Sequence, residues 1–120
     1  MNIEQAMKND VFVVAGDTIN SEKYACKIKN ALLQNGYTVH CVGKELKSIN
    51  EISGEIEVID LCINPARGLD LLKECKKKYK GVVIQPGAES EEILAFLEKN
   101  KVPYVEGCVL KGLEKYPRNK

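Results

Sequence analysis

The sequence of 120 residues predicts an α/β fold of three layers, in which helices cover both faces of a five-stranded parallel sheet. Five short apolar runs recur along the chain, and their near-continuous character is typical of strands that are buried on both faces. Helical patterns separate these runs, and this alternation implies parallel strands joined by right-handed crossovers. The predicted strands are residues 11–15, 37–42, 58–63, 81–84 and 102–105, and we expect the order 3-2-1-4-5 in the sheet.

Three longer helical patterns and one short pattern lie between these strands. Asn35-Gly36 provides an end for the first helix, and Ser90 is placed to cap the last one. The short, weaker helix is predicted over residues 46–52. The apolar faces of the longer helices are formed by Ala25, Ile28 and Leu32, by Leu69, Leu72, Cys75 and Tyr79, and by Ile93, Phe96 and Leu97.

Composition and length indicate one domain over residues 1–120, with a core over about 10–114. Residues 1–8 read as a loose helical lead-in and residues 111–120 as a polar tail.

The net charge of +1 provides no strong field for nucleic acid. No apolar run approaches the roughly 20 residues of a membrane helix, and the first ten residues lack the pattern of a signal peptide. We therefore expect a cytoplasmic protein without nucleic-acid or membrane partners.

The five cysteines are widely spaced, and none forms a Cys-x-x-Cys pair. Zinc would need clustered ligands, and the chain contains a single histidine, His40, so we expect no metal site. Cys41 and Cys62 fall within predicted strands, where a thiol behaves as a small hydrophobic group. Cys108 follows the fifth strand; it is either a reactive thiol or a structural residue.

The ends of the predicted strands are the expected binding edge, because ligands of open parallel sheets bind beyond the carboxyl ends of the strands. Glycine at such an end allows a ligand to approach the backbone, and a glycine that leads into a helix favours a bound phosphate. The residues at these ends are Gly16-Asp17-Thr18, Gly43-Lys44, Asn64-Pro65, Gln85-Pro86-Gly87 and Gly107-Cys108. The alternative is that these glycines only end the strands.

The chain resembles the small stand-alone CoA-binding proteins of the YccU-like type, which are single Rossmann-like domains related to the CoA-binding domain of succinyl-CoA synthetase. The residues behind this resemblance are Gly16, Gly36-Tyr37, Val42, Asp60, Gln85-x-Gly87, Glu91 and Cys108. The resemblance covers about Val11 to Glu114 and implies that Val42, Gln85 and Gly87 belong to the ligand site. The chain departs from the family at Asp17, Gly43-Lys44, Ala25-Cys26, Pro65-Ala66 and Gly107.

Charges at the first two strand ends bear on the ligand. Asp17 places a carboxylate where a diphosphate would lie, so that nearby cations are needed, and Lys23 and Lys44 are available. NAD sites usually have an acid after the second strand, whereas Lys44 suits an additional ribose phosphate, as in CoA and NADP. Lys44 is otherwise a solvated loop lysine.

These observations predict a non-catalytic or regulatory protein that binds CoA or an acyl-CoA, a small-molecule nucleotide ligand, at the carboxyl edge of the sheet. The predicted contacts are Gly16, Asp17, Thr18, Lys23, Val42, Gly43, Lys44, Asn64, Pro65, Gln85 and Gly87. One alternative is a small NADP-linked or thiol-based redox enzyme that uses Cys108. The other is an interaction module of the same fold that has lost its ligand.

Overall fold

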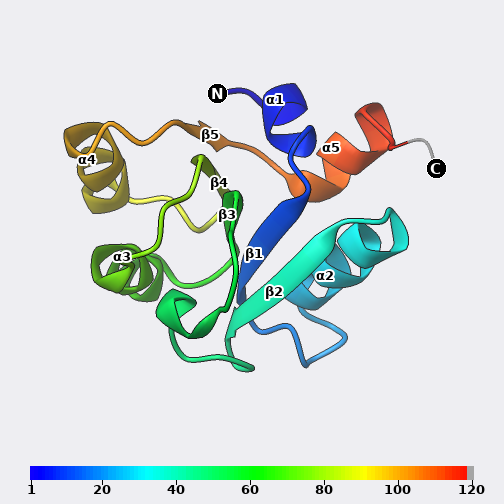
Figure 1. Cartoon of the computed structure of the whole chain (residues 1–120), viewed down its shortest axis with the longest axis horizontal. Helices are drawn as coiled ribbons and strands as arrows, with labels where there is room; N and C mark the ends of the chain where they lie inside the picture. Colours follow the sequence, from blue (N-terminus) through cyan, green and yellow to red (C-terminus); the bar gives the residue numbers. More distant parts are fainter. Residues whose placement is uncertain (119–120) are drawn as a thin grey trace.

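A computed structural model describes residues 1–118 and has the three expected layers (Figure 1). The strands are β1 (Val11–Gly16), β2 (Thr38–Gly43), β3 (Val58–Leu61), β4 (Gly81–Ile84) and β5 (Tyr104–Glu106), and all neighbouring pairs are parallel. The helices are α1 (Ile3–Met7), α2 (Tyr24–Gln34), α3 (Pro65–Glu74), α4 (Glu91–Lys99) and α5 (Val109–Lys115). A single 3₁₀ turn, η1 (Ile49–Glu51), replaces the short helix expected over residues 46–52. The predicted fold class is confirmed.

The strand order is β2-β1-β3-β4-β5, so the third strand lies beside β1 and not outside β2 as expected. The physical reason is the difference in polarity between the two strands. Every residue of β3 is buried, which requires neighbours on both sides, whereas β2 begins with the exposed Thr38 and suits an edge. After β2, the chain therefore crosses back over β1 to form β3.

Alternating residues of the strands form two separate cores, one on each face of the sheet. Val13 and Ala15 of β1 pack with η1, α3 and α4, whereas Phe12 and Val14 pack with α1, α2 and α5. The α3–α4 layer and the α1–α2–α5 layer lie on opposite sides of the sheet in Figure 1. The fold therefore exposes the two ends of the sheet, while its faces are covered.

Helix boundaries follow from capping groups. Ser90 accepts a hydrogen bond from the Ile93 amide, as expected for the cap of α4. Helix α3 begins one turn earlier than its apolar pattern, because Asn64 accepts from the Ala66 amide and Pro65 occupies the first helical position. It ends at Glu74, so Tyr79 lies beyond the helix.

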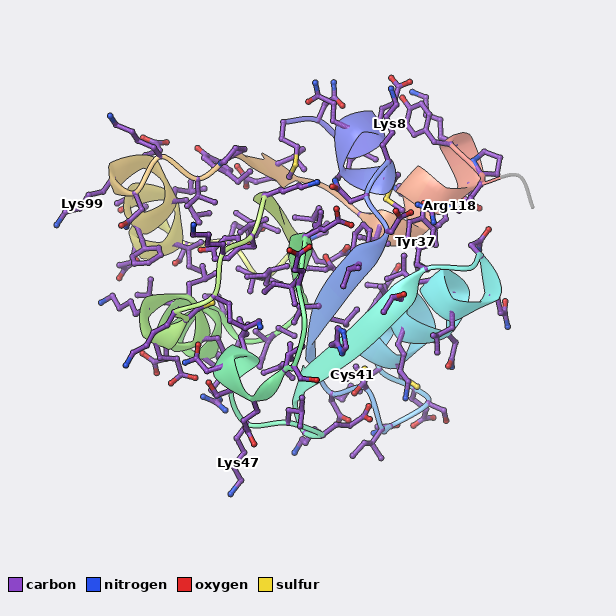
Figure 2. The ribbon with its side chains drawn as sticks, viewed as in Figure 1. Lys8, Tyr37, Cys41, Lys47, Lys99 and Arg118 are labelled. Atoms are coloured by element: carbon purple, nitrogen blue, oxygen red, sulfur yellow. The ribbon has the colours of Figure 1, made fainter. Side chains whose placement is uncertain are left out.

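The expectation of a polar tail over residues 111–120 was wrong for its described part. Val109, Gly112 and Leu113 of α5 are buried against the sheet and α1. Arg118 lies with its guanidinium 3.7 Å from the centre of the Tyr37 ring (Figure 2). It also forms an ion pair of 2.9 Å with Asp10. Residues 119 and 120 lie outside the described residues.

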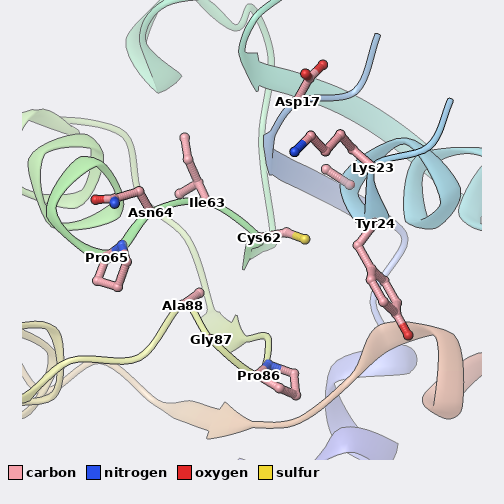
Figure 3. A pocket seen from close by; sticks show the side chains of 11 residues that line it. Asp17, Lys23, Tyr24, Cys62, Ile63, Asn64, Pro65, Pro86, Gly87 and Ala88 are labelled. Atoms are coloured by element: carbon pink, nitrogen blue, oxygen red, sulfur yellow. The ribbon is translucent and has the colours of Figure 1, made fainter. Parts of the chain in front are cut away.

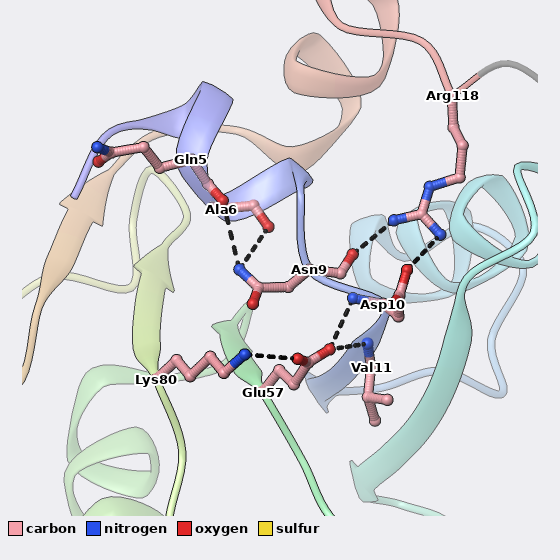
Figure 4. Close-up of polar contacts among 8 residues, drawn as sticks. All are labelled: Gln5, Ala6, Asn9, Asp10, Val11, Glu57, Lys80 and Arg118. Atoms are coloured by element: carbon pink, nitrogen blue, oxygen red, sulfur yellow. Dashed lines mark hydrogen bonds and ion pairs between the residues drawn. The ribbon is translucent and has the colours of Figure 1, made fainter.

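The start of β1 is tied to both the middle and the end of the chain (Figure 4). Glu57 accepts hydrogen bonds from the backbone amides of Asp10 and Val11 and forms a 2.9 Å ion pair with Lys80. Arg118 donates to the Asn9 carbonyl. These contacts hold the amino edge of the sheet, opposite the predicted binding edge.

Asp60 lies at the centre of β3, between Val14 of β1 and Val83 of β4. Its side chain is fully buried, and neither carboxyl oxygen has a hydrogen-bond partner among the described residues. Burial raises the pKa of Asp60 well above its usual value of 3.8. Asp60 is therefore the buried side chain that is held without a hydrogen-bond partner among residues 1–118, and its raised pKa favours the protonated form.

We expect the raised pKa of Asp60 to make the protein less stable as the pH rises. The unfolded chain releases this proton above about pH 4, while the folded chain retains it until the pH reaches the raised pKa. Within this window the free energy of unfolding of wild type should fall, relative to Asp60→Asn, by about 1.4 kcal/mol per pH unit. Urea unfolding of both proteins at several pH values tests this. A difference that does not change with pH would contradict it, and Asp70→Asn on the exposed side of α3 serves as control.

Arg118 should stabilise the fold through its position on Tyr37. Arg118→Lys keeps the positive charge but loses the planar group that lies on the ring, so the free energy of unfolding should fall by about 1 kcal/mol. The ion pair with the exposed Asp10 contributes little to this value. Thermal unfolding provides the measurement, with Lys99→Ala at the exposed end of α4 as control. An equal melting temperature for wild type and Arg118→Lys would refute this role.

Candidate functional site

A cleft of about 490 Å³ opens at the carboxyl edge of the sheet (Figure 3). Its walls are the segments that follow β1, β3 and β4. After β1 the chain forms β2 on one side, and it then returns to place β3 on the other side. The cleft therefore lies at the point where the direction of strand addition reverses, which is the usual ligand position in open parallel sheets.

The structure places five of the predicted contact residues in the wall of this cleft. They are Asp17, Lys23, Asn64, Pro65 and Gly87. Lys23 reaches from the β1–α2 segment toward Asp17 in Figure 3, while Asn64 and Pro65 form the opposite wall at the start of α3. The cleft is thus bounded by charged groups on the α2 side and by the beginning of α3 on the other side.

Asp17 orders the loop between β1 and α2. Its Oδ1 accepts hydrogen bonds from the backbone amides of Asn20, at 3.1 Å, and Ile19, at 3.2 Å. The Asn20 amide is the main cause that lowers the pKa of Asp17, and the positive charges of Lys44 and Lys23 lower it further. Asp17 is therefore an ionised carboxylate at the cleft, but it does not cap α2.

The first turn of α2 has free donors beside Asp17. Lys23 occupies the capping position, and its side chain makes no capping hydrogen bond. The backbone amides of Tyr24 and Ala25 have no acceptor within residues 1–118, and both residues line the cleft. An uncapped helix start with an adjacent lysine is a favourable environment for a phosphate group.

Thr18 faces away from this cleft and is 1% exposed. Its hydroxyl donates to a carboxylate oxygen of Glu45 at 2.5 Å, and Lys29 lies 3.3 Å from the same oxygen. The Thr18 hydroxyl is the main cause that lowers the pKa of Glu45. Burial raises the pKa of the adjacent Cys41 to about 11. This cluster fastens the loop after β2 to the turn after β1.

Gly16 and Gly43 have a packing role at the same edge. A Cβ atom on Gly16 would lie 2.3 Å from the Cys62 carbonyl oxygen, and one on Gly43 would lie 2.9 Å from the Gly16 carbonyl oxygen. Side chains at these positions would push the turns apart. Val42 is buried in the core below them. Lys44 is exposed next to this turn and does not line the cleft.

Gln85 is 3% exposed and connects β4 to α5. Its Oε1 accepts a hydrogen bond of 2.8 Å from the Val109 amide. Its amide nitrogen makes no hydrogen bond within residues 1–118 and keeps contact with solvent, since it is not among the buried polar atoms without a partner. Gln85 also lines a smaller pocket of about 190 Å³ with Tyr24, Cys62, Pro86, Cys108 and Lys111.

The two pockets adjoin, because Tyr24, Cys62 and Pro86 belong to both. Sequence reasoning missed Tyr24, which is 58% exposed at the first residue of α2. Its place at the start of the first helix after the Gly16 turn was the available signal. The sequence analysis also placed Cys62 within a predicted strand. In the structure, Cys62 follows the end of β3 and its side chain enters the site (Figure 3).

Within residues 1–118, no group of three or more His, Cys, Asp or Glu side chains is arranged to hold a metal ion. Over the same residues, no helix has the length and apolar character needed to cross a membrane.

Several solved structures share this fold. A conserved hypothetical protein from Pyrococcus furiosus is 30% identical, with a TM-score of 0.74 over 86% of this chain and 98% of that one. A hypothetical protein from Pyrococcus horikoshii is 21% identical, with a TM-score of 0.83 over 94% of this chain and 88% of that one. Prb, a protein redesigned for binding, is also 21% identical, with a TM-score of 0.84 over 98% and 92% of the two chains. The last two comparisons show the fold alone.

No curated protein matches the chain at a significant level. The family model described as the CoA binding domain matches residues 10–114, which include all five strands and the segments around both pockets. The chain therefore belongs to the CoA binding domain family.

Proposed function

We propose that this protein binds CoA or an acyl-CoA in the cleft at the carboxyl edge of the sheet and that it does so without catalysing a reaction on it. Family membership supports CoA binding in general. The observation that supports this particular site is the cleft at the reversal point of the sheet, next to the uncapped start of α2. The diphosphate would accept hydrogen bonds from the Tyr24 and Ala25 amides, and Lys23 would balance its charge.

A binding role without catalysis agrees with the way in which the polar side chains near the cleft are used. Asp17 accepts two backbone amides, and Asn64 accepts the Ala66 amide at the start of α3. Thr18 donates to Glu45. These groups hold turns in place, and such groups are poor general bases because their lone pairs or protons are already engaged.

Native mass spectrometry of the purified protein and titration calorimetry with CoA, NADP and NAD would test this proposal directly. We expect CoA to bind with one molecule per site and more tightly than the two dinucleotides. Failure of CoA to bind, or tighter binding of NADP, would overturn it in favour of the ligand-free module or the NADP-linked alternative.

Asp17→Asn should raise the affinity for CoA severalfold. The variant keeps the Oδ1 atom that accepts the Ile19 and Asn20 amides, and so it removes the negative charge without removing the loop contacts. The gain should shrink as salt is added, because ions screen the repulsion between the carboxylate and the diphosphate. Calorimetry at two salt concentrations measures both effects. An affinity unchanged at low salt would mean that no diphosphate lies at this turn.

Lys44→Glu should weaken CoA more than dephospho-CoA. Lys44 is exposed after β2, and its charge reaches the Asp17 side of the cleft. A phosphate on the ribose is the group that dephospho-CoA lacks, so a selective loss would assign Lys44 to that phosphate. Lys47→Glu makes the same charge change farther along the loop and serves as the matched control (Figure 2). Equal losses for the two ligands would exclude this role.

A further inference from the structure

The smaller pocket at the sheet edge contains two thiol groups. Cys62 follows β3 and Cys108 follows β5, and both side chains are partly buried. Lys111, one turn into α5, lines the same pocket. Its volume of about 190 Å³ is less than half of that of the adjoining cleft, so it can admit only a narrow end of a larger molecule.

The two thiols are not bonded to one another, because both cysteines are free in the structure. Each sulfur is therefore available to a second sulfur that a ligand brings into the pocket.

Gln85 offers a hydrogen-bond donor to a ligand in the pocket. Its side chain is 3% exposed, its carbonyl oxygen accepts from the Val109 amide, and its amide nitrogen, which makes no hydrogen bond within residues 1–118, keeps contact with solvent at the pocket. A polar group fixed at the wall of a pocket can orient a ligand. A carbonyl oxygen of a ligand that enters the pocket would accept from this nitrogen.

We propose that Cys108 is a thiol–disulfide exchange site that accepts the CoA thiol from CoA disulfide. This inference rests on the proposed function, because the nucleotide part of the ligand would occupy the larger cleft. The thin pantetheine arm would then pass Tyr24 and Pro86 into the smaller pocket, where the Gln85 amide donates to one of its carbonyl groups.

The exchange is a balanced displacement. The Cys108 thiol loses its proton to solvent, and its sulfur attacks one sulfur of CoA disulfide. The bond between the two CoA sulfurs breaks, a bond between Cys108 and one CoA forms, and the second CoA leaves as a thiolate that takes up a proton. The disulfide supplies the oxidising equivalent, so no further oxidant is needed.

Cys108, and not Cys62, is the attacking residue. Burial is the main cause that raises the pKa of Cys62 to about 12, which keeps this thiol protonated. Cys108 shares the pocket with Lys111, whose positive charge attracts the anionic disulfide to this thiol. Cys62 therefore forms the wall of the pocket.

The test is reaction of the reduced, desalted protein with CoA disulfide, followed by intact mass and peptide mapping. We expect one added CoA on Cys108, formed on the order of tenfold faster than the adduct with cystamine, because binding raises the local concentration of the disulfide. Adenosine 3′,5′-bisphosphate, which lacks the thiol arm, should slow the reaction with CoA disulfide but not that with cystamine.

Four variants locate the reaction. Cys108→Ser should lose the adduct, and Cys75→Ser, a matched change of a partly buried cysteine outside the pocket, should keep it. Cys62→Ser should also keep it. Lys111→Gln leaves the thiol and should slow the exchange severalfold, which shows the role of Cys108 even if Cys108→Ser folds poorly. An adduct on Cys62, or an unchanged rate in Lys111→Gln, would overturn the assignment.

Calorimetry with CoA under reducing conditions separates this inference from the proposed function. If CoA binds while CoA disulfide reacts no faster than cystamine, the exchange site is refuted and CoA binding stands. If CoA does not bind and neither disulfide is favoured, both are refuted. If CoA binds, and if CoA disulfide modifies Cys108 selectively in a reaction that adenosine 3′,5′-bisphosphate slows, both the CoA site and the exchange site are supported.

Discussion

The burial of β3 on both faces is the constraint on which the rest of the structure depends. The strand Val58–Leu61 contains no exposed residue, because helices cover its two faces and β1 and β4 cover its two edges. Its central position forces the chain to cross back over β1 after β2, which creates the reversal of direction at the carboxyl edge. The same position isolates Asp60 from water and places Cys62, just beyond the strand, at the floor of both pockets.

The turns at this edge are held by contacts that leave little freedom. Gly16 lies against the Cys62 carbonyl, and Gly43 lies against Gly16, so three strand ends are in direct backbone contact. The hydrogen bond from Thr18 to Glu45 adds a side-chain link between two of the same segments. Rigid turns reduce the entropy that a ligand would have to remove on binding, and this helps a small domain to provide a formed site.

Much of the fold was accessible from the sequence, because apolar runs and capping residues act locally. Asn35-Gly36 and Ser90 define helix ends through contacts within a few residues. Strand order was not accessible in the same way, since it depends on which strand needs two neighbours. For the site, the expectation that ligands bind beyond the carboxyl ends of the strands identified Asp17 and Asn64. The same expectation could not distinguish a glycine that faces a ligand from a glycine that packs against another turn. That distinction at Gly16 depends on Cys62, which is distant in sequence.

The two pockets differ in the way that a long, asymmetric ligand requires. The larger cleft has charged groups and free backbone donors at the α2 side, whereas the smaller one is narrow and contains two thiols. Tyr24 belongs to the wall of both, at the residue where α2 begins. A ligand whose phosphates lie at the helix start must therefore pass this ring to reach the thiols. The proposed ligand, a nucleotide that ends in a thin thiol arm, matches this arrangement, while a dinucleotide would bring a second bulky base to the smaller pocket.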